Sequence, residues 1–334
     1  LFVIGGGPAG YTAALLGVRK GLTVGIAEAA GWGGTCTNRG CIPTKTYIDI
    51  LRTRACYERA ARSGVWGSPG EAVNLGALRR RTLRIVGRLS KGIEYLLERS
   101  GVGIHRGRAR LDGGRAVSVG RERIEAGAIL VATGSSPRRA AQLDAQGVIT
   151  SDDVFDLTDV PSPVVVAGAG AVGMEMAHIF SCLGADVTVI EEQDRILPSL
   201  DEEVSRFVEN HYRSVRFMTG ARILAITPRG PRLSLEVADR AGAVAVEAQA
   251  CVSCVGRVPV LPEGVREAGI ELGETGGILV DARMHTSAEG VYAAGDVTGS
   301  HMYAYVAARE AEVAVSHITG DTPRTMDYST VPVV

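Results

Sequence analysis

The chain has 334 residues, 46% of them hydrophobic, and its 36 Lys and Arg against 37 Asp and Glu give a formal net charge of −1. This length predicts two or three domains, and the balanced charge gives no reason to expect nucleic acid or another polyanion as a partner. No apolar run reaches the roughly 18 residues that span a bilayer, and no signal-peptide pattern precedes the first predicted strand, so we expect a cytoplasmic protein that binds no membrane.

The chain opens inside a predicted apolar strand, which a glycine-rich turn and a helix follow. Gly5, Gly7 and Gly10 have the spacing G-x-G-x-x-G, and a second predicted strand ends in Glu28, 18 positions after the third glycine. In such a turn the first glycine permits the bend, the second lets a pyrophosphate approach the backbone, and the third lets helix and strand pack closely. The helix N-terminus favours phosphate charge, and Glu28 falls where a carboxylate can bind a ribose. The segment therefore predicts a dinucleotide site.

Two cysteines, Cys36 and Cys41, follow in the glycine-rich segment GWGGTCTNRGCIPTK. Pro43 suits the first turn of a helix, so Cys41 would lie at or just before a helix N-terminus, where the dipole and free N–H groups favour a thiolate. A redox pair is the favoured interpretation. The alternatives are two buried thiols or a structural disulfide, which would stabilise the fold by only about 2 kcal/mol across so short a loop.

A long scaffold helix is expected within residues 71–99, where apolar side chains recur at helical spacing. The same stretch carries the basic cluster of the chain, which consists of Arg79, Arg80, Arg81, Arg84 and Arg88. Because these arginines alternate with the apolar positions, we interpret them as a solvated helix face.

The opening pattern returns at a constant offset of 163 residues, with Gly168, Gly170, Gly173 and Glu191. One such pattern is weak support for a nucleotide site, because glycine turns without a ligand are common, but two copies with the same acidic spacing are strong support. Glu191 and Glu192 would repel a 2′-phosphate, and the next arginine is Arg195, so NAD is favoured over NADP at this second site.

The remaining cysteines are expected to be core thiols: Cys56, Cys182, Cys251 and Cys254. Cys251 and Cys254 form a C-x-x-C in an apolar run typical of a strand, where residues three apart point to opposite faces. This is poor geometry for one metal ion or one disulfide, so no metal site is expected.

Four segments resemble the class I pyridine nucleotide-disulfide oxidoreductase family, and most of all its dihydrolipoamide dehydrogenases. They are GGTCTNRGCIPTK at 33–45, ILVATGSSP at 129–137, VGRVP at 255–259 and VYAAGDVTG at 291–299. The resemblance runs along the whole chain.

The resemblance implies roles for particular residues. Cys36 would exchange with the substrate disulfide, and Cys41 would lie against the flavin. Lys45, paired with Glu175, would lie by the flavin N5 edge, where a cation stabilises negative charge on the reduced ring. Asp296 would bind the ribityl chain of FAD. Judged by the residues alone, Lys45 and Glu175 would be interpreted as ordinary helix-surface charges.

The residues expected to bind FAD or NAD come from the two glycine loops and the family-like segments: Gly5, Gly7, Pro8, Ala9, Gly10, Glu28, Gly34, Thr35, Ala132, Thr133, Gly134, Gly168, Gly170, Val172, Gly173, Glu191, Gly256, Arg257, Gly295 and Asp296.

The expected fold is α/β, with two Rossmann-like three-layer nucleotide-binding domains and the NAD domain inserted into the FAD domain. We expect the FAD domain at 1–150 and 282–334 and the NAD domain at 151–281. NAD and the Cys36–Cys41 pair would face opposite sides of the flavin ring, so the expected enzyme is an NAD-dependent flavoprotein that oxidises a dithiol such as dihydrolipoamide.

Two residues depart from the family pattern: Tyr305 stands where the dehydrogenases carry a histidine, and Val260 where asparagine is usual. Both ends of the sequence look trimmed, and the family's C-terminal interface domain, which supplies a His–Glu pair to the partner subunit, is expected to lie outside it. The whole protein is expected to be a homodimer that acts on a small dithiol or a lipoyl domain of a 2-oxoacid dehydrogenase complex. The alternatives are a related reductase of another disulfide or of mercuric ion, and a cofactor-binding module without catalysis.

Overall fold

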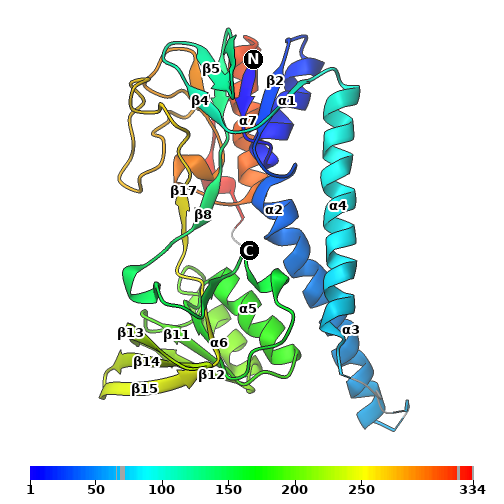
Figure 1. Ribbon diagram of the computed structural model, residues 1–334, viewed down its shortest axis with the longest axis vertical. Helices are drawn as coiled ribbons and strands as arrows, with labels where there is room; N and C mark the ends of the chain where they lie inside the picture. Colours follow the sequence, from blue (N-terminus) through cyan, green and yellow to red (C-terminus); the bar gives the residue numbers. More distant parts are fainter. Residues whose placement is uncertain (65, 68–71, 322–323, 333–334) are drawn as a thin grey trace. The chain divides into compact units, whose positions relative to one another are not determined.

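The computed structural model describes residues 1–64, 66–67, 72–321 and 324–332 (Figure 1). Contacts within the chain divide it into two compact units. The first contains Leu1–Cys41, Ile85–Ser136 and Arg257–Pro332, and the second contains Ile42–Arg84 and Pro137–Gly256.

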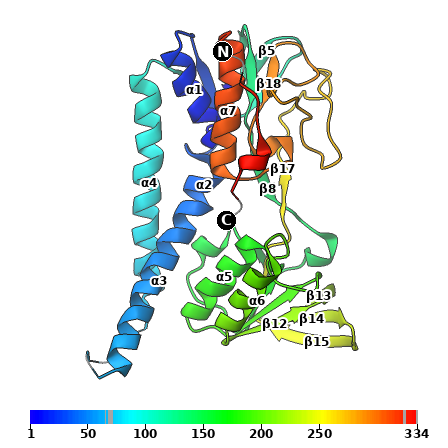
Figure 2. The ribbon, with the colours of Figure 1, turned by 180° about the vertical axis from the view of Figure 1, so that it is seen from behind.

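The first unit is built on a five-stranded parallel sheet in the order β18-β7-β1-β2-β3. Its strands are β1 (Phe2–Ile4), β2 (Gly25–Glu28), β3 (Gly103–Arg106), β7 (Ile129–Val131) and β18 (Val291–Ala293). Helices α1 (Pro8–Arg19) and α7 (Ala304–Ile318) lie side by side (Figures 1 and 2). A small antiparallel sheet consists of β4 (Ala109–Leu111), β5 (Ala116–Val119) and β6 (Glu122–Glu125).

Alternation along the strands creates the three layers of this unit. Val3 of β1 and Leu130 of β7 pack in a core with α1 and α7, whereas Phe2 and Ile4 pack in a second core with β4 and β5. Neighbouring side chains of a strand point to opposite faces, so a fully apolar strand must be covered on both sides.

The second unit has a five-stranded parallel sheet in the order β12-β11-β10-β16-β9. Its strands are β9 (Val148–Thr150), β10 (Val164–Ala167), β11 (Val187–Glu191), β12 (Val215–Thr219) and β16 (Ala250–Ser253). Its other elements are the helices α5 (Ala171–Cys182) and α6 (Glu202–His211), and the antiparallel strands β13 (Arg222–Arg229), β14 (Arg232–Asp239) and β15 (Gly242–Ala248). Val164 and Val166 of β10 pack with α5, and Val165 packs with β14.

The two sheets have the same spatial order, so the duplication extends well beyond the glycine motif. In each, the glycine-loop strand is central and the strand that ends in the acidic residue lies next to it. The strands β18 and β9 lie at corresponding edges of the two sheets. In the sequence, however, β18 is the last strand of its sheet and β9 is the first strand of the other. The predicted α/β fold with two Rossmann-like three-layer domains is confirmed.

The limits of the compact units differ from the domain limits expected from the sequence. Residues 148–150, placed at the end of the FAD domain, form β9 and pair with β16 of the second sheet. Residues 257–281, placed in the NAD domain, belong to the first unit. The assignment of each domain to its nucleotide stays a prediction.

The remaining elements join or extend the sheets. They are α2 (Gly34–Asn38), α3 (Cys41–Arg62), α4 (Leu75–Arg99), the two-stranded ladder of β8 (Ser135–Pro137) and β17 (Arg257–Pro259), and the 3₁₀ turns η1 (Ala141–Leu143), η2 (Val154–Asp156), η3 (Asp296–Thr298) and η4 (Tyr328–Thr330). The long helix predicted within 71–99 is α4; residue 71 lies outside the described residues. Among those described, no helix combines the length and apolarity needed to cross a membrane.

Candidate active site

The first glycine loop joins β1 to α1 as the sequence predicts. Gly5 has a φ of +107°, and a Cβ on it would lie 2.3 Å from the carbonyl oxygen of Ala132. A Cβ on Gly10 would lie 1.8 Å from the Gly5 oxygen. Gly7 caps α1, and Pro8 and Ala9 form its first turn. Side chains are therefore excluded at the two positions where the loop meets its own helix and the end of β7.

Glu28 braces this loop from the end of β2. Its Oε2 accepts a hydrogen bond from the N–H of Gly6 at 2.7 Å, and its Oε1 accepts one from Ala30 at 2.7 Å. Trp32 packs on the same loop, because a Cβ on Gly6 would lie 2.7 Å from its ring. The carboxylate predicted to bind a ribose thus also fixes the loop, and each oxygen keeps a further lone pair for a ligand.

The second glycine loop repeats these contacts. Gly168 has a φ of +96°, and a Cβ there would lie 2.6 Å from the oxygen of Cys254, which follows β16 as Ala132 follows β7. A Cβ on Gly173 would lie 1.9 Å from the Gly168 oxygen. Glu191, 9% exposed, accepts hydrogen bonds from the N–H of Ala169 at 2.6 Å and of Gln193 at 2.9 Å.

Both loops leave space where a pyrophosphate would approach. A Cβ on Gly170 would meet no heavy atom within 4 Å, and one on Gly7 would come no closer than 3.7 Å to Gly34. No side chain caps α1 or α5, both fully described, so their first-turn N–H groups remain for an anion. Val172, in the first turn of α5, is 41% exposed at the loop. The residues present therefore fit two dinucleotides.

Cys36 and Cys41 form a disulfide, with their Cα atoms 4.6 Å apart. Cys36 lies within α2, and Cys41 is the first residue of α3, the helix N-terminal position that the sequence predicts. The N–H of Gly33 donates to the carbonyl of Gly6 at 2.8 Å, and a Cβ on Gly34 would lie 2.7 Å from the Cα of Gly7. The disulfide segment is thus fastened to the first glycine loop.

Asn38, which the sequence analysis missed, holds this segment together. Its amide donates to the carbonyls of Gly31, Trp32 and Gly34 at 2.9–3.2 Å. Its position between the two cysteines, as a short polar residue in a glycine-rich turn, was the available signal.

Lys45 and Glu175 form an ion pair within the second unit. Lys45 lies one turn after Cys41 on α3, and Glu175 lies in the second turn of α5. The Lys45 side chain is 64% exposed and that of Glu175 29%. An exposed pair of this kind contributes little to stability.

Asp296 begins the turn η3 after Gly295. It is held by Ser135, which the sequence analysis missed. The hydroxyl of Ser135 donates to its Oδ2 at 2.6 Å, and the guanidinium of Arg257 donates to that hydroxyl at 2.8 Å and to the Ser135 carbonyl at 2.9 Å. Arg257 also lies 3.5 Å from the hydroxyl of Thr35. Arg257 therefore links the disulfide segment to the Asp296 turn within the first unit.

The segment that contains Thr133 and Gly134 forms a turn, because Gly134 has a φ of +74°. Thr133 donates its hydroxyl to the carbonyl of Val260, and the Val260 N–H donates to Gly134 at 2.9 Å. These contacts use only the backbone of Val260, which explains why valine can replace the usual asparagine there. Gly256 has a φ of +100° and accepts from the N–H of Arg138 at 2.9 Å.

Tyr305, in the place of the usual histidine, lies in the first turn of α7. Its ring stacks on Tyr303 at 5.4 Å, its hydroxyl donates to the carbonyl of Pro332, and 42% of the residue is exposed. A phenol ring therefore stands at this helix end, where the family usually has an imidazole.

The other cysteines divide into two groups. Cys251 and Cys254 are free and pack in cores on opposite faces of the second sheet, as predicted; burial raises the pKa of the Cys251 thiol to about 12. Cys182 is partly buried. The prediction was wrong for Cys56, which is exposed, because the apolar stripe that buries α3 ends near Leu51.

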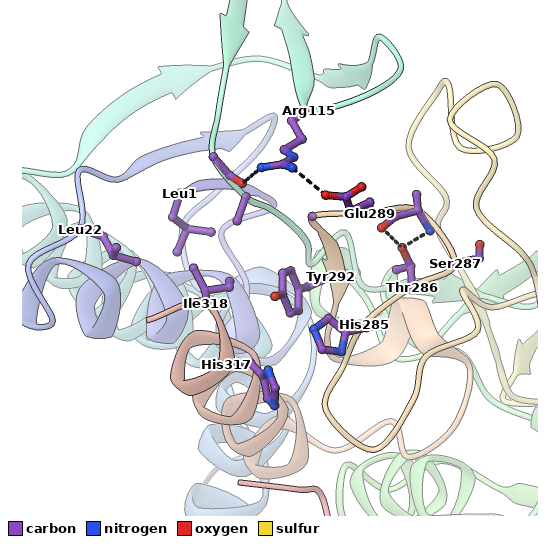
Figure 3. A pocket seen from close by; sticks show the side chains of 14 residues that line it. Leu1, Leu22, Arg115, His285, Thr286, Ser287, Glu289, Tyr292, His317 and Ile318 are labelled. Carbon is purple, nitrogen blue, oxygen red and sulfur yellow. Dashed lines mark hydrogen bonds and ion pairs between the residues drawn. The ribbon is translucent and has the colours of Figure 1, made fainter. Parts of the chain in front are cut away.

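A cavity of about 650 Å³ in the first unit has none of the predicted site residues in its lining. Figure 3 shows the side chains that line it. It is lined by Leu1, Ala128 and Gly290, which precede β1, β7 and β18, together with side chains such as His285 and His317. Nucleotides bind at the carboxyl ends of parallel strands, so this cavity at the amino ends is not the predicted cofactor site.

The pyridine nucleotide-disulphide oxidoreductase family matches residues 1–311. A dihydrolipoyl dehydrogenase from Chlorobaculum parvum is 37% identical over 99% of this chain and 72% of its own length, and one from Bacillus subtilis is 30% identical over 99% and 73%.

Solved structures agree. LpdA from Mycobacterium tuberculosis has a TM-score of 0.89 at 30% identity, covering 99% of this chain and 74% of that one. The flavoprotein disulfide reductase RclA from Escherichia coli has a TM-score of 0.84 at 24% identity, covering 97% and 72%, which shows the shared fold.

These matches confirm the prediction of a flavin-dependent disulfide oxidoreductase, and FAD and NAD are the cofactors of such enzymes. Two duplicated glycine loops and a disulfide fastened to the first of them are the features on which the assignment depends in this chain. The chain belongs to the pyridine nucleotide-disulphide oxidoreductase family.

Proposed function

We propose that this chain carries electrons from a dithiol of the dihydrolipoamide type to NAD⁺, through the Cys36–Cys41 disulfide and FAD. The observation that carries the proposal is the disulfide at the start of α3, hydrogen-bonded through Gly33 to the first glycine loop. The names of the most similar relatives, dihydrolipoyl dehydrogenases, support the choice of substrate.

The two sulfur atoms have different tasks in this proposal. Cys36 forms the mixed disulfide with the substrate, and Cys41 lies at the helix N-terminus, where its thiolate is favoured. The substrate dithiol loses two electrons and two protons and leaves as a disulfide, while the Cys36–Cys41 bond is reduced. Bound FAD supplies the two-electron step between sulfur and nicotinamide, and NAD⁺ leaves as NADH with release of a proton.

The other site residues bind and orient the cofactors. Glu28 and Asp296 hold the ribose and ribityl hydroxyls of FAD, and Glu191 holds the ribose of NAD. Lys45, held by Glu175, places a cation where negative charge develops on reduction.

NAD is favoured over NADP by the surroundings of Glu191. Arg195 donates to the carbonyls of Pro198 and Leu200 at 3.0 and 3.3 Å, which occupies the guanidinium that could have bound a 2′-phosphate. Arg222 pairs with Glu192 at 3.3 Å, so its positive charge is also compensated and offers less attraction to a 2′-phosphate.

We further propose that the base for thiol exchange is the His–Glu pair of a partner subunit, as the family resemblance implies, and that the working protein is a cytoplasmic homodimer. The physiological substrate would then be free dihydrolipoamide or a lipoyl domain.

The test is an anaerobic titration of the whole protein with NADH and with dihydrolipoamide, followed by the visible flavin spectrum. We expect a yellow protein that gains a long-wavelength charge-transfer band on two-electron reduction by either compound. Cys41→Ser should lack this band, whereas the control Cys56→Ser, at an exposed thiol, should keep it.

Three results would count against the proposal. A band that persists in Cys41→Ser would show that the sulfur roles are wrong. Reduction by NADH but not by dihydrolipoamide, with turnover of mercuric ion or another disulfide, would replace the substrate. A colourless protein that takes up no FAD would leave only a binding module.

A further inference from the structure

Glu310 is a fully buried carboxyl group that no step above uses. It lies on α7 with 0% of its surface exposed. No Lys or Arg in the described part of the chain forms an ion pair with it. Acidic side chains are almost never fully buried without a partner, so this residue requires an explanation.

Its two oxygens accept hydrogen bonds from two segments that are far apart in the sequence. The N–H of Gly295 donates to Oε2 at 2.6 Å, and the hydroxyl of Tyr328 donates to Oε1 at 2.7 Å. Gly295 directly precedes Asp296, the residue proposed to bind the ribityl chain. The carboxylate therefore satisfies a backbone donor that would otherwise be buried without a partner.

The conformation of Gly295 makes this contact specific. Its φ of +80° and ψ of −161° belong to a region that only glycine adopts readily. A Cβ there would lie 3.2 Å from the Cβ of Ala307 and 3.4 Å from that of Ala9. The turn is thus pressed between α7 and α1, and the hydrogen bond to Glu310 fixes its rotation.

Asp296 is then held from both ends. Ser135 donates to its carboxylate at 2.6 Å, and Glu310 accepts the hydrogen bond from Gly295, the residue directly before Asp296. The side chain that meets the flavin is positioned by one contact to the carboxylate and one to the preceding backbone.

The titratable groups that act on Glu310 are Asp296 and Tyr328. Burial raises the pKa of Glu310 to about 7, with a smaller contribution from Asp296. Burial and Glu310 together raise the pKa of Tyr328, so the phenol remains a donor at neutral pH. The His301 ring stacks on Tyr328 at 4.4 Å and an interplanar angle of 8°, which holds the hydroxyl toward Glu310.

We infer that Glu310 is a positioning residue for the flavin-binding turn: it fixes Gly295 so that Asp296 meets the ribityl chain, and Tyr328 fixes Glu310. The inference rests on the proposed function, because it takes FAD as the ligand of Asp296. It also connects the segment 324–332, through Tyr328, to the cofactor site.

The test compares Glu310→Leu with Glu310→Gln. Apoprotein is reconstituted with FAD, and the dissociation constant is measured by quenching of flavin fluorescence. Leucine fills the space but accepts no hydrogen bond, so FAD affinity should fall about tenfold or more. Glutamine keeps an acceptor oxygen for Gly295 and should stay within about threefold of the wild type. A role in packing alone would rank leucine level with glutamine.

Two further variants complete the design. Glu312→Gln changes a part-exposed carboxylate on the same helix, which pairs with Arg309, and should leave FAD affinity unchanged. Tyr328→Phe removes only the hydroxyl and should weaken FAD by about threefold or more. If Glu310→Leu does not fold, the test is the FAD affinity of Tyr328→Phe compared with that of Glu312→Gln.

The inference is overturned if Tyr328→Phe and every folded Glu310 variant bind FAD as tightly as the wild type, or if leucine and glutamine have equal effects. Affinity for NAD, measured in the same variants, should not change, because its loop lies in the other unit. A wild-type protein that binds no FAD would contradict the proposed function, and this outcome is distinct from a variant that fails where the wild type binds.

Discussion

The two glycine loops can be tested separately by adding a single methyl group to each. Gly5→Ala places a Cβ 2.3 Å from the carbonyl oxygen of Ala132 at a φ of +107°, and Gly168→Ala places one 2.6 Å from the oxygen of Cys254 at a φ of +96°. A normal contact is about 3.4 Å or longer, so the backbone of each loop must move by roughly 1 Å.

The size of the effect follows from two terms. A non-glycine residue in such a backbone region costs about 1–3 kcal/mol, and overpacking costs about 1–3 kcal/mol more. Together these terms give a loss of about 2–6 kcal/mol, which lowers the melting temperature of a unit of this size by roughly 4–24 °C.

The chain contains a matched control for each loop. Gly21 and Gly184, at the ends of α1 and α5, have φ values of +84° and +89°, but a Cβ on either would meet nothing within 4 Å. Gly21→Ala and Gly184→Ala therefore carry the backbone strain without the close approach. The strain alone, about 1–2 kcal/mol, should lower the melting temperature by about 2–8 °C.

The assay is thermal unfolding together with FAD content from visible absorbance and NAD affinity from calorimetry. Gly5→Ala should lose FAD and keep NAD affinity within about twofold, and Gly168→Ala should do the reverse, because the two loops belong to different compact units. The reasoning is refuted if Gly5→Ala retains FAD and melts with Gly21→Ala, or if either loop variant affects both nucleotides alike.

Three shorter predictions concern single side chains. The pKa of Glu310 is raised from 4.5 to about 7, so its contribution to stability is fully present below pH 4.5 and is lost as the pH rises through 7. In urea unfolding, Glu310→Gln should therefore gain about 2.5 kcal/mol of stability relative to the wild type between pH 5 and pH 8. A difference that does not change with pH would contradict the pKa shift. Glu191→Ala leaves two loop N–H groups without their acceptor and should weaken NAD about tenfold or more in calorimetry, whereas Glu192→Ala, at a 61% exposed side chain, should change it by less than about threefold. Alkylation of the native protein at pH 8, measured by mass spectrometry, should label Cys56 and spare Cys251, because burial and a pKa of about 12 keep the Cys251 thiol protonated. Equal labelling of both cysteines would show that Cys251 is not buried.

The sequence alone determined the features that depend on local spacing. Gly5 and Gly168 were identifiable because a sharp turn between a buried strand and a helix needs glycine at fixed positions. Cys36 and Cys41 were identifiable because their glycine-rich segment directly follows the first nucleotide motif. The pairing of Lys45 with Glu175 required the family pattern, since 130 residues separate them.

The acidic residue on α7 shows the limit of such reasoning. Glu310 lies on the stripe formed by Ala307, Ala311 and Ala314, which are buried with it, so helical periodicity marks it as a carboxylate on an apolar face. Periodicity could not show what it bonds. Its partners, Gly295 and Tyr328, lie 15 residues before it and 18 after it.

Local chemistry therefore determined the nucleotide loops, the disulfide and the type of fold, because each depends on neighbours within one turn or one strand. Only the tertiary structure decided which strands lie at the sheet edges, that Cys56 and Lys45 are exposed, and that Ser135 and Glu310 hold the Asp296 turn. These features depend on contacts between distant segments, and the free energy of such contacts is set by the burial and hydrogen bonding of the packed chain rather than by the spacing of residues along it.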